Sequence, residues 1–191
     1  MRKVLLSLAA AGAVAASPAF AAAEPGPYVG VGVTHDNISG TQDAEGLGFN
    51  GIGGTVFAGY NLPLGEKAFA GVEANFDLSS AKVADATSSI KARNAYGASA
   101  RLGYRLSEGA ALYGRVGYQR GSLKFDDGLA TEFKSSRDGL RLGAGLEANV
   151  AGNTAVRVEY NHTNYYRDKD VDPVNTGLAN NQATVGLVVG F

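Results

Sequence analysis

The sequence alternates apolar residues with polar or small ones over long stretches, and this period-two pattern constrains the fold more than any other feature. In the last segment Ala183, Val185, Leu187, Val189 and Phe191 share one face, and most residues between them are small or polar. Such alternation indicates β-strands, because successive side chains of a strand point to opposite faces. Beyond the N-terminal region, no segment approaches 18 uninterrupted apolar residues. If this chain enters a membrane, it must do so as a closed β-barrel.

Short turns punctuate the alternating segments at a constant interval. Three compact clusters start at Pro63, Ser107 and Ala151, so that 44 residues separate each start from the next. Longer polar stretches lie between the clusters, at residues 37–47, 79–91, 126–136 and 166–181. Short turns that alternate with long loops are typical of an up-and-down barrel in which each kind of connection faces one compartment. We predict eight antiparallel strands, at residues 28–36, 49–62, 68–78, 93–106, 111–123, 137–150, 154–165 and 181–191.

The two faces of these strands indicate which one meets lipid. The polar face is rich in Gly, Ser, Thr and Asn, and it carries too few charges for a surface in bulk water. Its small residues suit the narrow interior of an eight-stranded barrel. The opposite register would place charges such as Arg101 and Glu147 against lipid, at a total cost of about 10 kcal/mol. We therefore predict an all-β, eight-stranded antiparallel transmembrane barrel with its apolar face outward.

Aromatic residues are placed as two belts at the membrane interfaces would require. Three lie on the apolar face near the short turns, namely Tyr60, Tyr104 and Phe191. Three more fall nearer the long loops, namely Phe76, Tyr96 and Tyr118. Phe57 and Tyr113 have the opposite phase, so we expect their rings inside the barrel.

The N-terminus has the features of a secretory signal. Arg2 and Lys3 precede an apolar run from Val4 to Ala16, and Ala19-Phe20-Ala21 forms a small-x-small cleavage pattern. The run is too short to span a bilayer as a helix, which needs about 20 residues. We predict a cleaved signal peptide over residues 1–21, with cleavage after Ala23 as the alternative, and a barrel domain over residues 22–191.

Charge and cysteine content exclude several classes of protein. Loss of Arg2 and Lys3 changes the formal net charge from −1 to −3, so the chain lacks the basic excess that nucleic-acid binding requires. The chain contains no cysteine, which excludes both a lipoprotein signal and a disulfide framework. We expect no nucleic-acid partner.

Several strand motifs resemble the OmpA/OmpX-like family of small outer-membrane barrels, the porin-family outer membrane protein β-barrel domain. Residues 71–77 (GVEANFD) resemble its third strand, and residues 100–104 (ARLGY) are similar to the A-K-L-G-Y stretch of the fourth. Residues 145–147 (GLE) resemble the sixth strand, and residues 157–160 (RVEY) the R-L-E-Y of the seventh. The resemblance covers nearly the whole predicted barrel domain. It implies a Gram-negative outer-membrane location, with outer-membrane lipid and lipopolysaccharide around the barrel.

The C-terminal strand and the end of the chain add to what the resemblance implies. Val185, Leu187, Val189 and Phe191 resemble the terminal strand that the barrel assembly machinery reads, so we expect that machinery and periplasmic chaperones as partners in biogenesis. Because the sequence ends at Phe191, we expect no peptidoglycan-binding domain and compare the chain with barrel-only members.

Nine predicted inward positions carry charge, five positive and four negative. An unpaired charge is costly in a narrow interior with little water, so we expect these groups to pair and to leave no continuous channel. Truncation of one partner should be costly, and reversal of both should restore much of the loss. The predicted ion-pair network comprises Glu73, Arg101, Arg115, Glu147, Arg157 and Glu159, and the other inward charges are Asp77, Arg105 and Arg141. The resemblance implies an alternative role for Glu73, Arg101, Glu147 and Arg157, as a gate in which carboxylates exchange arginine partners.

Candidate catalytic and metal-binding residues are few. His162 has the outward facing of a lipid-modifying barrel enzyme, but Asn164 stands where that enzyme type needs Ser, and His35 has no partnered nucleophile nearby. Asp168, Asp170 and Asp172 have the alternating spacing of a calcium loop. However, Pro173 stands where an EF-hand needs Gly, and Ala179 where it needs Glu. We therefore predict no catalytic residues, no metal site and no cofactor.

Three functions remain open at this point. The first is a structural or surface-interaction barrel of the cell envelope, whose loops contact host or environmental ligands. The second is a low-conductance porin for small solutes, and the third is a lipid-modifying barrel enzyme. The lumen charges bear on the second, and the third would require a Ser-His pair on the lipid face.

Overall fold

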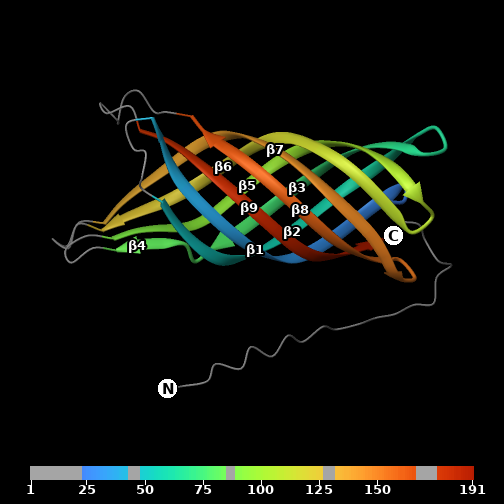
Figure 1. The fold of residues 1–191 in the computed structure, drawn as a ribbon, viewed down its shortest axis with the longest axis horizontal. Coiled ribbons are helices and arrows are strands. Elements are labelled where there is room, and N and C mark those ends of the chain that lie inside the picture. Colours follow the sequence, from blue (N-terminus) through green and yellow to red (C-terminus); the bar gives the residue numbers. More distant parts are fainter. Residues whose placement is uncertain (1–22, 43–47, 85–88, 127–131, 167–175) are drawn as a thin grey trace, which may run out of the picture.

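The computed structural model describes residues 23–42, 48–84, 89–126, 132–166 and 176–191. Figure 1 shows that these residues form a single closed barrel of long, tilted strands. Within the described ranges, no helix is long and apolar enough to cross a membrane. The strands are β1 (Gly26–Gln42), β2 (Gly48–Leu64), β3 (Ala68–Ser79), β4 (Lys82–Ala84), β5 (Ser89–Ser107), β6 (Ala110–Asp126), β7 (Glu132–Ala151), β8 (Thr154–Tyr165) and β9 (Thr176–Gly190).

Eight of these strands close the ring. Each long strand pairs antiparallel with the next long strand along the chain, and β1 pairs with β9 to complete the barrel. The three-residue strand β4 pairs with β5 alone and extends the wall at one end. The predicted all-β, up-and-down architecture of eight antiparallel strands is therefore confirmed.

The strands are staggered around the ring. A row of directly paired residues that starts at Tyr28 passes through Glu73 on β3 and Arg141 on β7, and it returns to β1 at Ile38. The row has then climbed ten residues, which is the stagger that lets eight tilted strands close. Residues at the same height along the axis therefore belong to different rows, and residues of one row lie at different heights.

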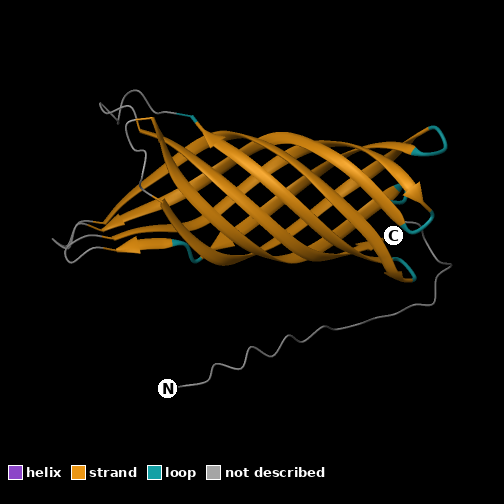
Figure 2. Ribbon diagram, viewed as in Figure 1, coloured by secondary structure: helices purple, strands orange, loops and turns teal. Residues whose placement is uncertain are grey.

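The two ends of the barrel differ in their connections. Figure 2 shows three short turns at one end, where the C-terminus also lies. We call this the short-turn end and the opposite one the long-loop end. Gly65 and Gly152 lie in these turns with φ of +82° and +50°, a left-handed conformation that glycine adopts without strain. The predicted turns at Pro63, Ser107 and Ala151 agree with these positions.

Most strands extend further toward the long-loop end than the sequence predicts. β1 continues to Gln42 rather than residue 36, β5 begins at Ser89, and β9 begins at Thr176. The added residues still pair in the ladder, as in the β1–β9 pairs Gly40–Leu178 and Gln42–Thr176. Backbone pairing does not require an apolar face, so strand that leaves the membrane loses the alternation that marks it in the sequence.

The apolar face points outward, as predicted. Val33 is 61% exposed and Leu102 is 63% exposed, values that a water-facing wall of a globular protein would not repeat around a whole ring. All six residues of the predicted aromatic belts are exposed on this face. Phe57 and Tyr113 are buried inside the barrel, also as predicted. An apolar outer wall around a polar interior is the arrangement of a transmembrane β-barrel.

Candidate functional site

The interior of the barrel holds two polar layers, and the layer nearer the short turns contains the predicted network. Every member lies three to six residues from the short-turn end of its strand. Five strands contribute, because period-two alternation and the stagger bring these positions to similar heights. We call this set the ion-pair layer; it consists of Glu73 from β3, Arg101 from β5, Arg115 from β6, Glu147 from β7, and Arg157 and Glu159 from β8.

Each arginine of the ion-pair layer contacts two carboxylates. Arg157 lies 2.6 Å from Glu73 and 2.8 Å from Glu147. Arg101 lies 2.5 Å from Glu147 and 3.4 Å from Glu73. Arg115 lies 2.9 Å from Glu73 and 2.8 Å from Glu159. The structure thus brings all six predicted residues into one connected set, in which Glu73 contacts all three arginines.

Aromatic side chains fill the remaining space of this layer. The Arg101 guanidinium donates to the Tyr28 hydroxyl at 2.6 Å, and that hydroxyl donates to Glu73 at 2.8 Å. The Tyr113 hydroxyl donates to Glu159 at 2.5 Å. The guanidinium of Arg101 stacks 3.8 Å from the ring centre of Tyr113, and that of Arg157 lies 4.1 Å from the ring centre of Phe57. These planar contacts suit arginine because its guanidinium is flat and weakly hydrated.

Burial makes the pairing in this layer energetically necessary. All six charged residues are buried, and Arg157 is only 1% exposed. Removing a charged group from water costs several kcal/mol, so each charge needs a partner of opposite sign. Three positive and three negative side chains meet that need within the layer. The layer can therefore close the barrel interior without a resident ion.

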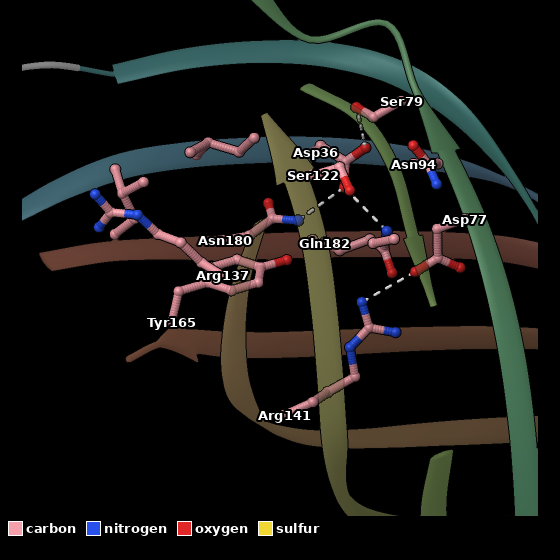
Figure 3. Close-up of a pocket in the computed structure, with 14 residues that line it drawn as sticks. Asp36, Asp77, Ser79, Asn94, Ser122, Arg137, Arg141, Tyr165, Asn180 and Gln182 are labelled. Carbon is pink, nitrogen blue, oxygen red and sulfur yellow. Dashed lines mark hydrogen bonds and ion pairs between the residues drawn. The ribbon is translucent and has the colours of Figure 1, made fainter. Parts of the chain in front are cut away.

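The second layer lies toward the long-loop end and contains more amides than charges. Asp77 is 3.1 Å from Arg141 and accepts hydrogen bonds from Thr55, Asn75 and Gln119. We call this set, with Asp36 and its partners, the amide layer. Asp36 accepts from Ser79 at 2.8 Å, from Asn180 at 3.0 Å and from Gln182 at 2.9 Å. Figure 3 shows Asp36 with Ser79, Asn180 and Gln182, and Asp77 with Arg141.

Sequence reasoning missed Asp36 as an interior residue. Asp36 is the last residue of the predicted first strand, 28–36, and the sequence prediction does not include it among the inward charges. The phase of Val29, Val31 and Val33 on the outer face continues through His35, which puts Asp36 inside. The alternation within the predicted strand therefore already carries the signal that identifies Asp36 as an interior residue.

The other residues singled out in the sequence lie on the outer face or at the short-turn end. Val185, Leu187 and Val189 lie on the outer face of β9, and Phe191 is exposed directly beyond its end. The backbone N–H of Phe191 donates to the carbonyl of Pro27 at 3.0 Å, which fixes the C-terminus against β1. Arg105 reaches the short-turn end and donates to the carbonyl of Ala23 at 3.2 Å.

The outward His162 is surrounded by amides. Its ring nitrogens lie 2.8 Å from the side-chain oxygen of Asn181 and 3.2 Å from that of Asn164. The Tyr160 hydroxyl donates to the same Asn181 oxygen at 2.9 Å. Over the described ranges, no group of three or more His, Cys, Asp or Glu side chains could hold a metal ion. The predicted signal peptide and Asp168, Asp170 and Asp172 lie outside the described residues.

The apolar wall, the closed ring and the charged interior define an outer-membrane β-barrel protein. The outer membrane protein beta-barrel domain matches residues 6–191, so this chain belongs to that family and is a protein of the cell outer membrane. In such barrels the short turns face the periplasm and the longer loops face the outside. The short-turn end is therefore the periplasmic end, and the long-loop end is the extracellular end.

Relatives in sequence carry matching descriptions. The chain is 34% identical to the 22 kDa outer membrane protein of Rhizobium leguminosarum bv. viciae over 173 residues, which cover 87% of this chain and 77% of the relative. It is 33% identical to the 25 kDa outer-membrane immunogenic protein of Brucella ovis over 123 residues, which cover 64% of this chain and 60% of that protein.

Solved structures show the same fold at low sequence identity. Ail, the attachment invasion locus protein of Yersinia pestis, superposes with a TM-score of 0.60 at 17% identity, over 88% of this chain and all of that chain. Neisserial surface protein A superposes with a TM-score of 0.63 at 16% identity, over 86% of this chain and 97% of that one.

Proposed function

We propose that this protein acts at the cell surface as a closed barrel that supports the envelope and presents its extracellular end to ligands. The observation that carries the proposal is the ion-pair layer, whose six buried charges and stacked rings fill the section of the lumen that a solute would have to cross. Between this layer and the amide layer a cavity has about 10 Å³ of room for the centres of water-sized molecules, which is enough for about one water. This packing favours a plug over a pore.

Single-channel recording in planar bilayers tests the proposal. We expect the refolded full-length mature protein to give no large steady conductance, because ions would have to displace paired charges that have no water to move into. The variant Glu73→Gln provides the comparison, since Glu73 contacts all three arginines of the layer. A large steady conductance of the wild-type protein would overturn the proposal.

The same recording distinguishes the closed plug from the alternative, a low-conductance porin with a gate. The observation that supports a gate is the position of Glu73, which can exchange one arginine partner for another without leaving the layer. If the Glu73→Gln variant conducts while it retains the heat-dependent gel mobility of a folded barrel, the layer is a gate. A variant that stays folded and closed supports the static plug.

The surface-interaction role rests on the family and on the charges of the loops. The structural neighbour Ail was solved in complex with sucrose octasulfate, a heparin analogue and a polyanion. In this chain the long polar segments 37–47, 79–91, 126–136 and 166–181 contain nine carboxylates against five basic side chains. This acidic excess would repel a polyanion, so we expect the surface partners of this protein to be neutral or cationic.

We also propose that the protein is not an enzyme. The lipid-modifying alternative needs a hydroxyl nucleophile in contact with a histidine. Among the described residues, the side chains that hydrogen-bond His162 are the amides of Asn164 and Asn181, neither of which can act as a nucleophile. Both surround His162 at the outer face of the barrel, where they can solvate its ring at the membrane surface.

Biogenesis provides a separate, testable proposal. We propose that Val185, Leu187, Val189 and Phe191 form the signal that the barrel assembly machinery reads, after export with periplasmic chaperones. The four residues share the outer face at the chain end, where an unfolded strand can be bound by its apolar face.

We expect Phe191→Asp to lower the amount of folded protein in the outer membrane while export and signal cleavage proceed. Leu102→Asp, on the same lipid face but far from the terminus, is the control that separates an assembly signal from loss of apolar surface. Normal outer-membrane levels of Phe191→Asp would reject the signal.

The contacts of Ala23 bear on the site of signal cleavage. We propose this site because Ala23 is buried against Phe69, Ala111 and Tyr113 at the periplasmic end, where its carbonyl accepts the bond from Arg105. Cleavage after Ala23 would remove these contacts. This packing supports residues 1–21 as the signal peptide.

A further inference from the structure

A cavity opens at the extracellular end of the barrel, above the amide layer. It has about 50 Å³ of room for the centres of water-sized molecules, which is enough for roughly three to five such groups. Asp36, Asp77, Asn180 and Gln182 lie along its polar side, and Ile38, Leu178 and Ala95 add apolar surface. Figure 3 shows the polar side chains of this cavity, with the carboxylate of Asp36 held by amide and hydroxyl groups.

Asp36 is the unusual group of this cavity. It is 2% exposed, and its hydrogen bonds come from Ser79, Asn180 and Gln182, all of which are neutral donors. Among the described residues, no cation lies within salt-bridge distance of its carboxylate, whereas Asp77 in the same layer pairs with Arg141 at 3.1 Å. A buried carboxylate without a counter-charge is costly, so the cavity offers a favourable place for a cation from outside.

The side-chain oxygen of Asn180 is the second observation. Asn180 is 6% exposed and lines the cavity, and its amide nitrogen donates to Asp36. Its side-chain oxygen accepts no hydrogen bond. A hydrogen-bond donor that enters the cavity would meet the free side-chain oxygen of Asn180 next to the negative charge of Asp36.

We propose that this cavity binds the head of a small organic cation, a primary ammonium or a guanidinium group. A cation of this kind donates several hydrogen bonds, which Asp36 and Asn180 can accept, and its carbon chain can contact Ile38 and Leu178. A bare metal ion fits less well, since calcium takes six to eight oxygen ligands and the cavity offers two carboxylates, one of them already paired.

The charges that face Asp36 are consistent with this ligand. The charge of Arg141 is directed at Asp77. Arg137 also lines the cavity, and its guanidinium extends away from Asp36 in the view of Figure 3. The acidic excess of the four long polar segments adds a field that attracts cations toward this end.

A titration of the mature protein in lipid nanodiscs tests the site. The probe is n-butylammonium chloride, and the readout is the NMR signals of the Asn180 and Gln182 side-chain amides. We expect a saturable shift of both signals with butylammonium and none with n-butanol, which has the same carbon chain without the charge. Equal responses to the two probes, or no response to either, would overturn the proposal. Sodium chloride and calcium chloride alone form the third arm, and the same saturable shift with either salt would reject an organic cation in favour of a metal ion.

Two variants sharpen the assignment. Asp36→Asn keeps the shape of the side chain and can still accept from Asn180 and Gln182, so we expect it to fold and to bind butylammonium at least about tenfold more weakly. Asp138→Asn removes the same charge from an exposed position near the same end, where Asp138 pairs with Arg120, and we expect a change below about twofold because solvent screens that charge. Equal weakening by both variants would reject a specific site, and wild-type affinity in Asp36→Asn would do so as well. The comparison of the two probes on the wild-type protein decides the question even if a variant does not fold.

This inference deepens the proposed surface role and rests on the outward orientation of the cavity. The two proposals can fail separately. A wild-type protein that conducts ions but binds butylammonium rejects the plug and keeps the site. A closed protein that ignores butylammonium rejects the site and keeps the plug.

Discussion

The ion-pair layer and the amide layer line the same barrel, yet they meet the cost of buried charge in different ways. In the ion-pair layer three arginines and three glutamates balance, and each arginine contacts two carboxylates. In the amide layer neutral donors surround the carboxylates, and Arg141 is the arginine that contacts one of them. The difference teaches that a polar interior can serve either as a plug or as a binding cavity, depending on whether its charges cancel within it.

Packing follows the same division. In the ion-pair layer the rings of Tyr28, Phe57 and Tyr113 lie against guanidinium groups and close the space between the charges. In the part of the chain that the structure describes, the amide layer has no comparable stack, and a cavity with about 50 Å³ of room for the centres of water-sized molecules opens beside it. The ion-pair layer therefore leaves room for about one water molecule on its extracellular side, whereas the cavity at the extracellular end has room for a ligand.

The largest expected effect is on Arg157. The change Arg157→Met leaves Glu73 and Glu147 buried with one positive partner fewer, and we expect it to lower the free energy of unfolding by about 3–5 kcal/mol. Urea unfolding of the refolded barrel in lipid, followed by the gel mobility of unheated samples, measures this change. Methionine keeps much of the side-chain volume, so a cavity contributes little to the result.

Two matched changes test the comparison between the layers. Arg141→Met leaves Asp77 with three neutral donors, so we expect a smaller loss, about 1.5–3 kcal/mol. Arg120→Met breaks an exposed pair with Asp138 on the outer side, where we expect a loss below about 1 kcal/mol. If Arg157→Met and Arg141→Met cost the same, the two layers do not differ in the way proposed.

A further pair of variants compares two glycines that lie next to aromatic rings, one in each layer. In the ion-pair layer a Cβ at Gly145 would overlap the ring of Tyr113, which its bond to Glu159 and its stack on Arg101 hold in place. We expect Gly145→Ala to lower the free energy of unfolding by about 1–3 kcal/mol. In the amide layer the nearest atom to a Cβ at Gly121 is the Tyr165 hydroxyl at 3.0 Å, and that ring borders the cavity and can move. We expect Gly121→Ala to cost less than about 1 kcal/mol.

The same unfolding measurement checks both glycine variants. A large loss for Gly121→Ala would show that the extracellular half is packed as tightly as the periplasmic half. That outcome would also count against room for a ligand in the cavity.

The shared contacts change one expectation drawn from the sequence. Reversal of an isolated pair should restore its energy, because the attraction depends only on opposite signs. Glu147, however, contacts both Arg101 and Arg157, so an arginine at that position would face Arg101. A double reversal within this network therefore exchanges one attraction for a new repulsion. Alternation in the sequence predicts that a charge lies inside the barrel, but it does not show how many charges of opposite sign that group contacts.

The sequence by itself determined the barrel, its number of long strands, its lipid-facing wall and the identity of most interior charges. These properties depend on side-chain alternation and turn spacing, which are local along the chain and are visible in residues such as Ala183 to Phe191. The extracellular ends of the strands were not predicted, because pairing continues there without an apolar face. Asp36 was missed at the last residue of a predicted strand, although the alternation places it inside.

Only the tertiary structure decided which arginine contacts which carboxylate. Glu73 and Arg141 stand in one row of paired residues, yet Glu73 contacts Arg157 while Arg141 contacts Asp77. The stagger of ten residues around the ring sets these heights, and it arises from the closure of all eight strands together. The sequence of a single strand cannot show the height of its side chains along the barrel axis, because that height is fixed only when the last strand pairs with the first.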